Sequence, residues 1–169
     1  SSSNWSEKKI NLSIALKIKE ILESYGTKVI MTRSDDRFLS LSARNAVVRR
    51  YNPDLFISVH CDSSSASSSY GTSAYYYRAY SQPLAKYIHQ ALVSTYRNMI
   101  YYGKEKKNID RGTNYYAFKV ARVEECPAVL IEYGFVSNTG ECQYLQNAST
   151  REILAKATVN GINNYIVNS

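Results

Sequence analysis

Residues 54–60 read Asp-Leu-Phe-Ile-Ser-Val-His, and this stretch decides the fold. Its nearly continuous apolar character is typical of a strand that is buried on both faces, as in a parallel sheet covered by helices. The histidine that ends it, His60, would lie at the carboxyl edge of the sheet, where ligands bind in open α/β domains. We therefore expect a functional site around His60.

Helices and further strands are predicted on both sides of this strand. Apolar residues recur at helical spacing from Glu7 to Tyr25, and Gly26 is a natural stop for that helix. Further helices are expected at about 40–51, 81–96, 139–146 and 150–167, and strands at 27–32, 71–77, 115–120 and 128–131. The alternation predicts a three-layer α/β sandwich: a mainly parallel, twisted sheet flanked by helices on both faces.

Length and composition indicate one globular domain spanning residues 1–169, without internal repeats. No apolar run is long enough to span a membrane, and the chain shows no signal peptide. The formal net charge of +7 favours polyanionic partners, either nucleic acid or an anionic cell wall, and does not choose between them.

A second candidate residue, Glu132, directly follows the predicted strand 128–131, so its carboxylate and His60 could meet at one sheet edge. This combination suits a zinc hydrolase, because zinc takes imidazole and carboxylate ligands and a further carboxylate can move the proton of water. The alternative for His60 is a core histidine at a strand end. An unpaired buried carboxylate is costly, which favours a functional role for Glu132.

The other histidine and the cysteines offer no comparable site. His89 neighbours the apolar stripe of its predicted helix, and we expect it on the surface. The widely spaced cysteines predict neither a cysteine zinc site nor a disulfide framework. Cys61 should point to the face opposite His60, because successive side chains of a strand alternate.

Four stretches resemble the zinc-dependent N-acetylmuramoyl-L-alanine amidases of the amidase-3 family. Their order and spacing fit, and the resemblance covers nearly the whole chain. The stretches are EKKINL (7–12), similar to E-K-x-x-N-L; TRSDD (32–36) with Leu41 and Arg44, similar to T-R-x-x-D and L-x-x-R; DLFISVH (54–60), close to A-D-L-F-I-S-I-H; and PAVLIEYGFVSN (127–138), close to P-A-V-L-V-E-x-G-F-I-S-N.

The resemblance implies that Glu7 and His60 bind Zn²⁺ and that Glu132 is the catalytic carboxylate. For Glu7, the alternative is an acidic residue that stabilises the first turn of a helix. The implied reaction hydrolyses the amide between N-acetylmuramic acid and the L-alanine of peptidoglycan. We then expect a monomeric, extracellular or wall-associated domain, with anionic wall polymers as possible partners and neither nucleic acid nor membrane.

Two departures from the family pattern matter. The family's first zinc histidine lies in a G-H-G-G segment after an N-terminal strand, and nothing here matches it. We expect that strand and the third zinc ligand in chain preceding Ser1. Cys61-Asp62-Ser63 also stands where the family usually has x-N-A. One alternative is a catalytically degenerate amidase-like domain that binds cell wall or a partner. A nucleic-acid-binding module is the other, suggested by the charge and the sixteen tyrosines, but it lacks a recognisable motif.

Overall fold

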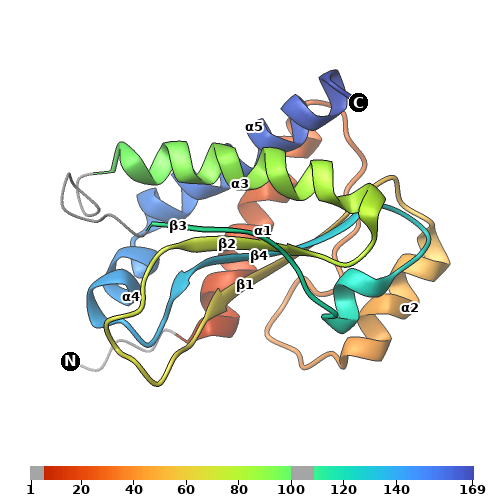
Figure 1. The fold of residues 1–169 in the computed structure, drawn as a ribbon. Coiled ribbons are helices and arrows are strands. Elements are labelled where there is room, and N and C mark those ends of the chain that lie inside the picture. The colour runs from red at the N-terminus through yellow and green to blue at the C-terminus, as the bar shows by residue number, and fades with distance from the viewer. Residues whose placement is uncertain (1–5, 100–108) are drawn as a thin grey trace.

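The computed structural model describes residues 6–99 and 109–169 (Figure 1). These residues form five α-helices, four strands and two short 3-10 helices. The helices are α1 (Glu7–Ser24), α2 (Leu41–Tyr51), η1 (Ala79–Ser81), α3 (Gln82–Arg97), η2 (Lys119–Arg122), α4 (Thr139–Gln146) and α5 (Ala148–Val167). The strands are β1 (Phe56–Asp62), β2 (Thr72–Tyr76), β3 (Asp110–Tyr115) and β4 (Ala128–Phe135).

The strands form one sheet in the order β1-β4-β2-β3. β1 runs parallel to β4 and β2 runs parallel to β3, whereas β2 and β4 are antiparallel. The expected α/β class is therefore confirmed, and the sheet is mixed because its central pairing is antiparallel. The strand predicted from residues 54–60 is confirmed as β1, at one edge of the described sheet.

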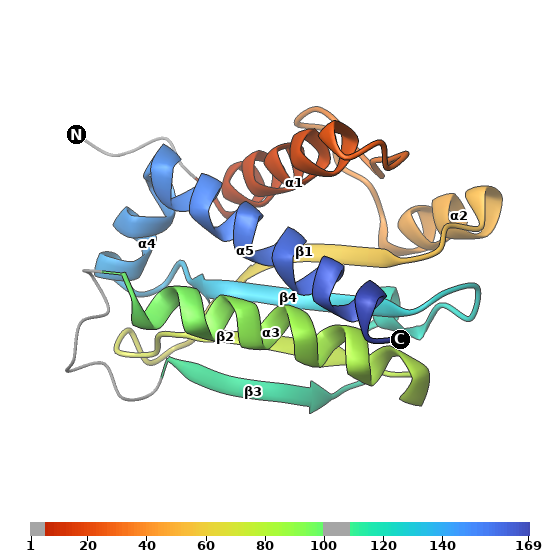
Figure 2. The ribbon, with the colours of Figure 1, turned by 90° about the horizontal axis from the view of Figure 1, so that it is seen from above.

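The main core lies between the sheet and the helices α1, α3 and α5 (Figures 1 and 2). Because side chains alternate along a strand, Val129, Ile131 and Tyr133 of β4 all face this core. None of the described helices is long and apolar enough to cross a membrane.

The opposite face of the sheet carries the candidate site. There, α2 and the segment around η2 pack against the start of β1 and β4, where Phe56 and Ala128 join a small second core. His60 and Glu132 point to this same face, farther along the two strands.

Two predicted strands differ from the structure. Residues 27–32 form no strand, because a strand needs a partner for its backbone groups and no described strand pairs with them. The strand expected at 115–120 lies instead at Asp110–Tyr115. Its backbone pairs with β2 there, and this pairing decides the strand's position over the β-propensity of the aromatic residues that follow. Glu132 lies inside β4 and does not follow it, since that strand continues to Phe135.

Candidate functional site

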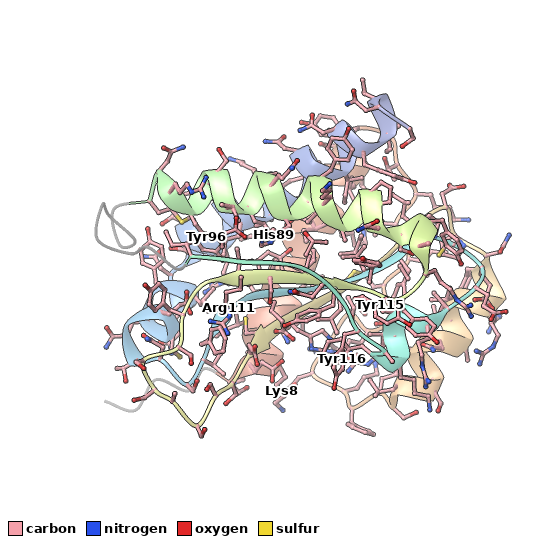
Figure 3. All side chains as sticks on the ribbon, in the orientation of Figure 1. Lys8, His89, Tyr96, Arg111, Tyr115 and Tyr116 are labelled. Atoms are coloured by element: carbon pink, nitrogen blue, oxygen red, sulfur yellow. The ribbon has the colours of Figure 1, made fainter. Side chains whose placement is uncertain are left out.

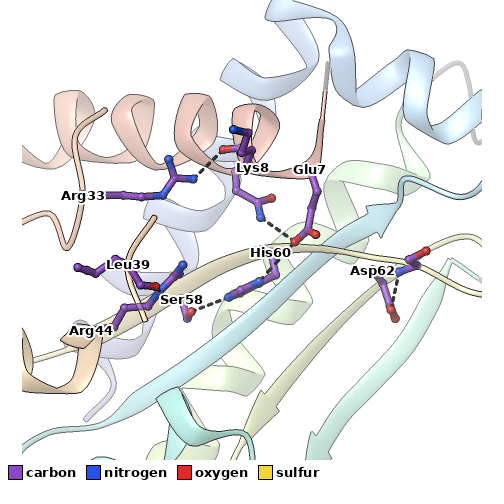
Figure 4. Close-up of polar contacts among 10 residues, drawn as sticks. Glu7, Lys8, Arg33, Leu39, Arg44, Ser58, His60 and Asp62 are labelled. Atoms are coloured by element: carbon purple, nitrogen blue, oxygen red, sulfur yellow. Dashed lines mark hydrogen bonds and ion pairs between the residues drawn. The ribbon is translucent and has the colours of Figure 1, made fainter. Parts of the chain in front are cut away.

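Glu7 and His60 lie side by side at one end of the sheet. Glu7 is the first residue of α1, which packs against β1, and its Oε1 lies 3.5 Å from Nδ1 of His60 (Figure 4). Asn11, one turn later in α1, donates from Nδ2 to the same Oε1 at 2.9 Å. These contacts, with His60 first, hold the pKa of Glu7 below its usual value despite partial burial.

The other nitrogen of His60 is held by its own strand. Nε2 lies 3.0 Å from Oγ of Ser58, which is two residues earlier and therefore on the same face of β1. The ring is thus fixed with Nδ1 towards Glu7, and 23% of its side chain is exposed. Nδ1 and the carboxylate of Glu7 thus face each other, and both side chains are partly exposed.

The spacing of this pair fits two ligands of one metal ion. Two ligands of a tetrahedral zinc ion, each about 2.0–2.2 Å from the metal, lie about 3.4 Å apart. The separation between Glu7 Oε1 and His60 Nδ1 is 3.5 Å. Among residues 6–99 and 109–169, no group of three or more His, Cys, Asp or Glu side chains could hold a metal. The described residues therefore fit a zinc ion as two ligands of an incomplete set.

Glu132 is the third predicted site residue, and it is paired with His60 in the parallel register of β1 and β4. Its Oε2 is buried without a hydrogen-bond partner among the described residues. Burial, and then the negative charges of Asp62 and Glu7, raise the pKa of Glu132 to about 8. β1 and β4 thus place Glu132 beside His60, and α1 brings Glu7 to the same histidine.

Sequence reasoning did not identify the residues that support this trio. Ser58 and Asn11 hold the candidate ligands, and Ser73 lies directly opposite Glu132 on β2. A serine or asparagine inside a strand or helix carries no local signal of such a role. Such a role arises only when the fold brings distant segments of the chain together.

Two arginines from the predicted motifs hold the loop beside the site (Figure 4). Arg33 donates to the carbonyl oxygens of Lys8 and Asp35 at 2.7 and 3.0 Å, respectively. Arg44 donates from Nε to the carbonyl oxygen of Leu39 at 3.2 Å, and burial lowers its pKa. These bonds tie residues 33–44 to the start of α1.

The expectation that His89 lies on the surface is wrong, since only 4% of this residue is exposed. Its Nε2 lies 2.7 Å from Oδ1 of Asp110, so the edge strand β3 supplies the partner that makes burial tolerable. Figure 3 shows His89 on the opposite side of the sheet from Lys8, the neighbour of Glu7. The pocket beside His89, Arg97 and Asp110 is therefore separate from the candidate site.

Comparisons with known proteins agree with this architecture. The sequence pattern of a family described as N-acetylmuramoyl-L-alanine amidase matches residues 1–164. The uncharacterized protein YqiI of Bacillus subtilis is 34% identical over 163 residues, which cover 94% of this chain and 74% of YqiI. The probable cell wall amidase LytH of Staphylococcus epidermidis is 30% identical over 94% of this chain, which spans 50% of LytH.

A solved structure matches the fold at similar identity. It is the catalytic domain of CwlV, an N-acetylmuramoyl-L-alanine amidase from Bacillus (Paenibacillus) polymyxa var. colistinus. The match has a TM-score of 0.87 and 34% sequence identity, and it covers 98% of this chain and 88% of that chain.

Proposed function

This chain belongs to the N-acetylmuramoyl-L-alanine amidase family, and we propose that it hydrolyses the amide between N-acetylmuramic acid and L-alanine in peptidoglycan. The proposal includes a zinc ion held by Glu7 and His60, with Glu132 as the proton-transferring carboxylate. The 3.5 Å approach of Glu7 to His60, beside the buried carboxyl of Glu132, is the observation that carries it. We also propose that the domain acts at the cell wall.

The residues around the pair would prepare it for a cation. Ser58 fixes the ring of His60, and Asn11 fixes the carboxylate of Glu7, so that neither ligand needs to reorient. A bound zinc would act as a Lewis acid: it would lower the pKa of a bound water to about 7 and would polarise a carbonyl group. Because catalytic zinc sites usually have three protein ligands, the proposal requires one more than the described residues supply.

Glu132 would carry the proton between the two halves of the reaction. The attacking water gives one proton to the carboxylate of Glu132 while its oxygen bonds to the lactyl carbonyl carbon. The same proton then passes to the nitrogen of L-alanine as the carbon–nitrogen bond breaks, leaving a carboxylic acid and a free amine. The acid then gives the second proton of the water to the amine, so that the products are a carboxylate and an ammonium group. Burial raises the pKa of Glu132 to about 8, and a cation held by Glu7 and His60 would favour the ionised form that accepts the proton.

Replacing Glu132 by glutamine tests this role in the protein as its gene encodes it. We expect Glu132→Gln to lower kcat for purified peptidoglycan by about 10²–10⁴-fold, with zinc content unchanged. The readouts are new amino groups released from peptidoglycan and zinc measured by elemental analysis. Glu20→Gln, an exposed change on α1, is the control and should keep full activity.

Two results would overturn the proposal. One is full activity of Glu132→Gln. The other is a zinc-loaded natural protein that binds peptidoglycan without cleaving it, which would support the non-catalytic binding domain instead.

A further inference from the structure

A cavity of about 350 Å³ opens between α2, η2 and the residues that follow β2. It is lined by three cationic side chains, a tyrosine and an asparagine: Arg78, Lys119, Arg122, Tyr77 and Asn45. No acidic side chain of the described residues lines this basic cavity. Its size and its charge suit a small anionic group.

The fold compensates the positive charges of the basic cavity only in part. Arg78 pairs with the carboxylate of Glu124, and its guanidinium lies over the ring of Tyr77, 5.4 Å from the centroid. Nζ of Lys119 donates to a neutral serine hydroxyl at 2.6 Å. Arg122 is exposed, and its side chain makes no hydrogen bond or ion pair within the described part of the chain. The guanidinium of Arg122 is therefore free to bind a carboxylate through two parallel hydrogen bonds.

The basic cavity lies on the same face of the sheet as Glu132, because α2 and η2 cover the start of β1 and β4 on that face. Glu132 is directly opposite Ser73 on β2, and alternate residues of a strand share one face, so Tyr75 also lies there. Tyr77 follows Ser73 by four residues, or about 13 Å at about 3.3 Å per residue. Tyr75 packs edge-on against Tyr116, which is 56% exposed, with ring centroids 6.3 Å apart. Tyr75, with Tyr116 beside it, thus lies between Glu132 and the cavity.

Peptidoglycan carries its carboxylates on the stem peptide. Its N-acetylated sugars are uncharged, and the carboxyl group of muramic acid is taken up in the amide that is cut. With that amide at Glu132, the peptide begins at L-alanine and ends in a carboxylate about four residues later. An extended chain of this length spans about 13–14 Å, which matches the distance from Glu132 to the basic cavity.

We propose that the basic cavity binds the terminal carboxylate of the stem peptide, which Arg122 contacts directly with Lys119 beside it. This inference rests on the proposed function, because the cleaved amide sets where the peptide begins. The cavity then makes the enzyme specific for stem peptides that reach it and end in a free carboxylate.

Arg122→Gln in the protein as its gene encodes it tests this contact. The substrates are two soluble muramyl peptides of equal length, one ending in a carboxylate and the other in a carboxamide. For the wild type, we expect KM to be about tenfold lower for the carboxylate with similar kcat, because the contact binds ground state and transition state alike. Arg122→Gln should raise KM for the carboxylate about tenfold and leave KM for the carboxamide unchanged. Arg49→Gln, exposed on α2 and outside the cavity, is the matched control and should change neither.

Binding of the same peptides to Glu132→Gln, measured by calorimetry, reports on the cavity without cleavage, and adding Arg122→Gln should cost about the same tenfold there. If the wild type cleaves both peptides and Arg122→Gln changes neither KM nor affinity, this inference alone fails. It fails too if Arg122→Gln weakens binding only to walls that carry phosphate polymers, since the cavity would then serve those polymers. If the peptides bind through Arg122 and the wild type cleaves neither, the proposed function fails and the cavity keeps its ligand.

Discussion

Nε2 of His60 lies 3.0 Å from Oγ of Ser58. A neutral imidazole has one donor and one acceptor nitrogen, so this contact and the approach of Nδ1 to Glu7 determine the tautomer together. If Nδ1 binds a metal, Nε2 carries the proton and donates it to Ser58. The serine thereby prepares the histidine for a cation on the side of Glu7.

Ser58→Ala should therefore weaken zinc binding without changing a ligand. We expect zinc affinity to fall about 10- to 100-fold, the usual effect of removing a partner that orients a metal ligand. Competition with a chromophoric chelator measures the change. Ser24→Ala, an exposed serine whose hydroxyl donates to Ile21 O at the end of α1, is the control. Equal zinc affinity in both variants would rule out the proposed role of Ser58.

Asp110 should make folding stability depend on pH through its contact with His89. The hydrogen bond from His89, and then the one from the backbone of Gly112, hold the pKa of Asp110 below its usual value. The native state then binds fewer protons than the unfolded state, so this contribution is present above the unfolded pKa of about 3.9 and is lost as pH falls through the folded pKa.

Asp110→Asn should accordingly lower the free energy of unfolding at pH 6 to 7 by about 1 kcal/mol, a modest value because Asp110 is half-exposed. The difference from the wild type should shrink as pH falls below about 3.9. Urea unfolding at several pH values provides the measurement, with the exposed Asp54→Asn as control. A difference that stays constant with pH would contradict the assignment.

The parts of the fold that depend on local patterns were predictable from sequence. Ile10, Ile14 and Ile18 recur at helical spacing and are buried in α1, and the apolar run before His60 forms β1. The antiparallel pairing of β2 with β4 depends on which strands meet in space, and no local pattern records that. His89 shows the same limit, because its burial depends on Asp110, which lies 21 residues away in sequence.

Some residues of the candidate site were likewise predictable from the sequence, and others were not. His60 and Glu132 were predicted because each follows a run of apolar strand residues, where an imidazole or a carboxylate is unusual. Ser58 and Ser73 were not, since a serine in a strand is ordinary until its neighbours are known. The register between β2 and β4 is what makes Ser73 a neighbour of Glu132.

Gly161 should tolerate no side chain, because the backbone of α3 lies directly against this position of α5. A Cβ atom at this position would lie 2.5 Å from Cα and 2.9 Å from the backbone nitrogen of Ile88. Gly161→Ala should therefore destabilise the fold by about 1–3 kcal/mol through overpacking, although alanine favours helix by about 1 kcal/mol. Chemical denaturation measures the loss. Asn163→Ala, exposed on the same helix, should be neutral or slightly stabilising.

Glu132 should destabilise the folded state of the metal-free protein at alkaline pH. The pKa of Glu132 is about 8 in the folded state and near 4.5 in the unfolded state. Between these two pH values the native state therefore binds more protons than the unfolded state. Stability therefore falls as pH rises through that window. Glutamine cannot ionise, so metal-free Glu132→Gln should melt at a higher temperature than the wild type at pH 8 to 9 and at a similar temperature at pH 5.

Adding zinc should reduce this difference, because a nearby cation favours the ionised carboxylate of the wild type. Thermal melts with and without zinc, at both pH values, make the comparison. A variant that is more stable and less active is the signature of a residue kept for chemistry at the expense of folding. Equal melting temperatures at pH 9 in the absence of metal would show that the Glu132 carboxyl is well solvated, and the argument for its raised pKa would then fail.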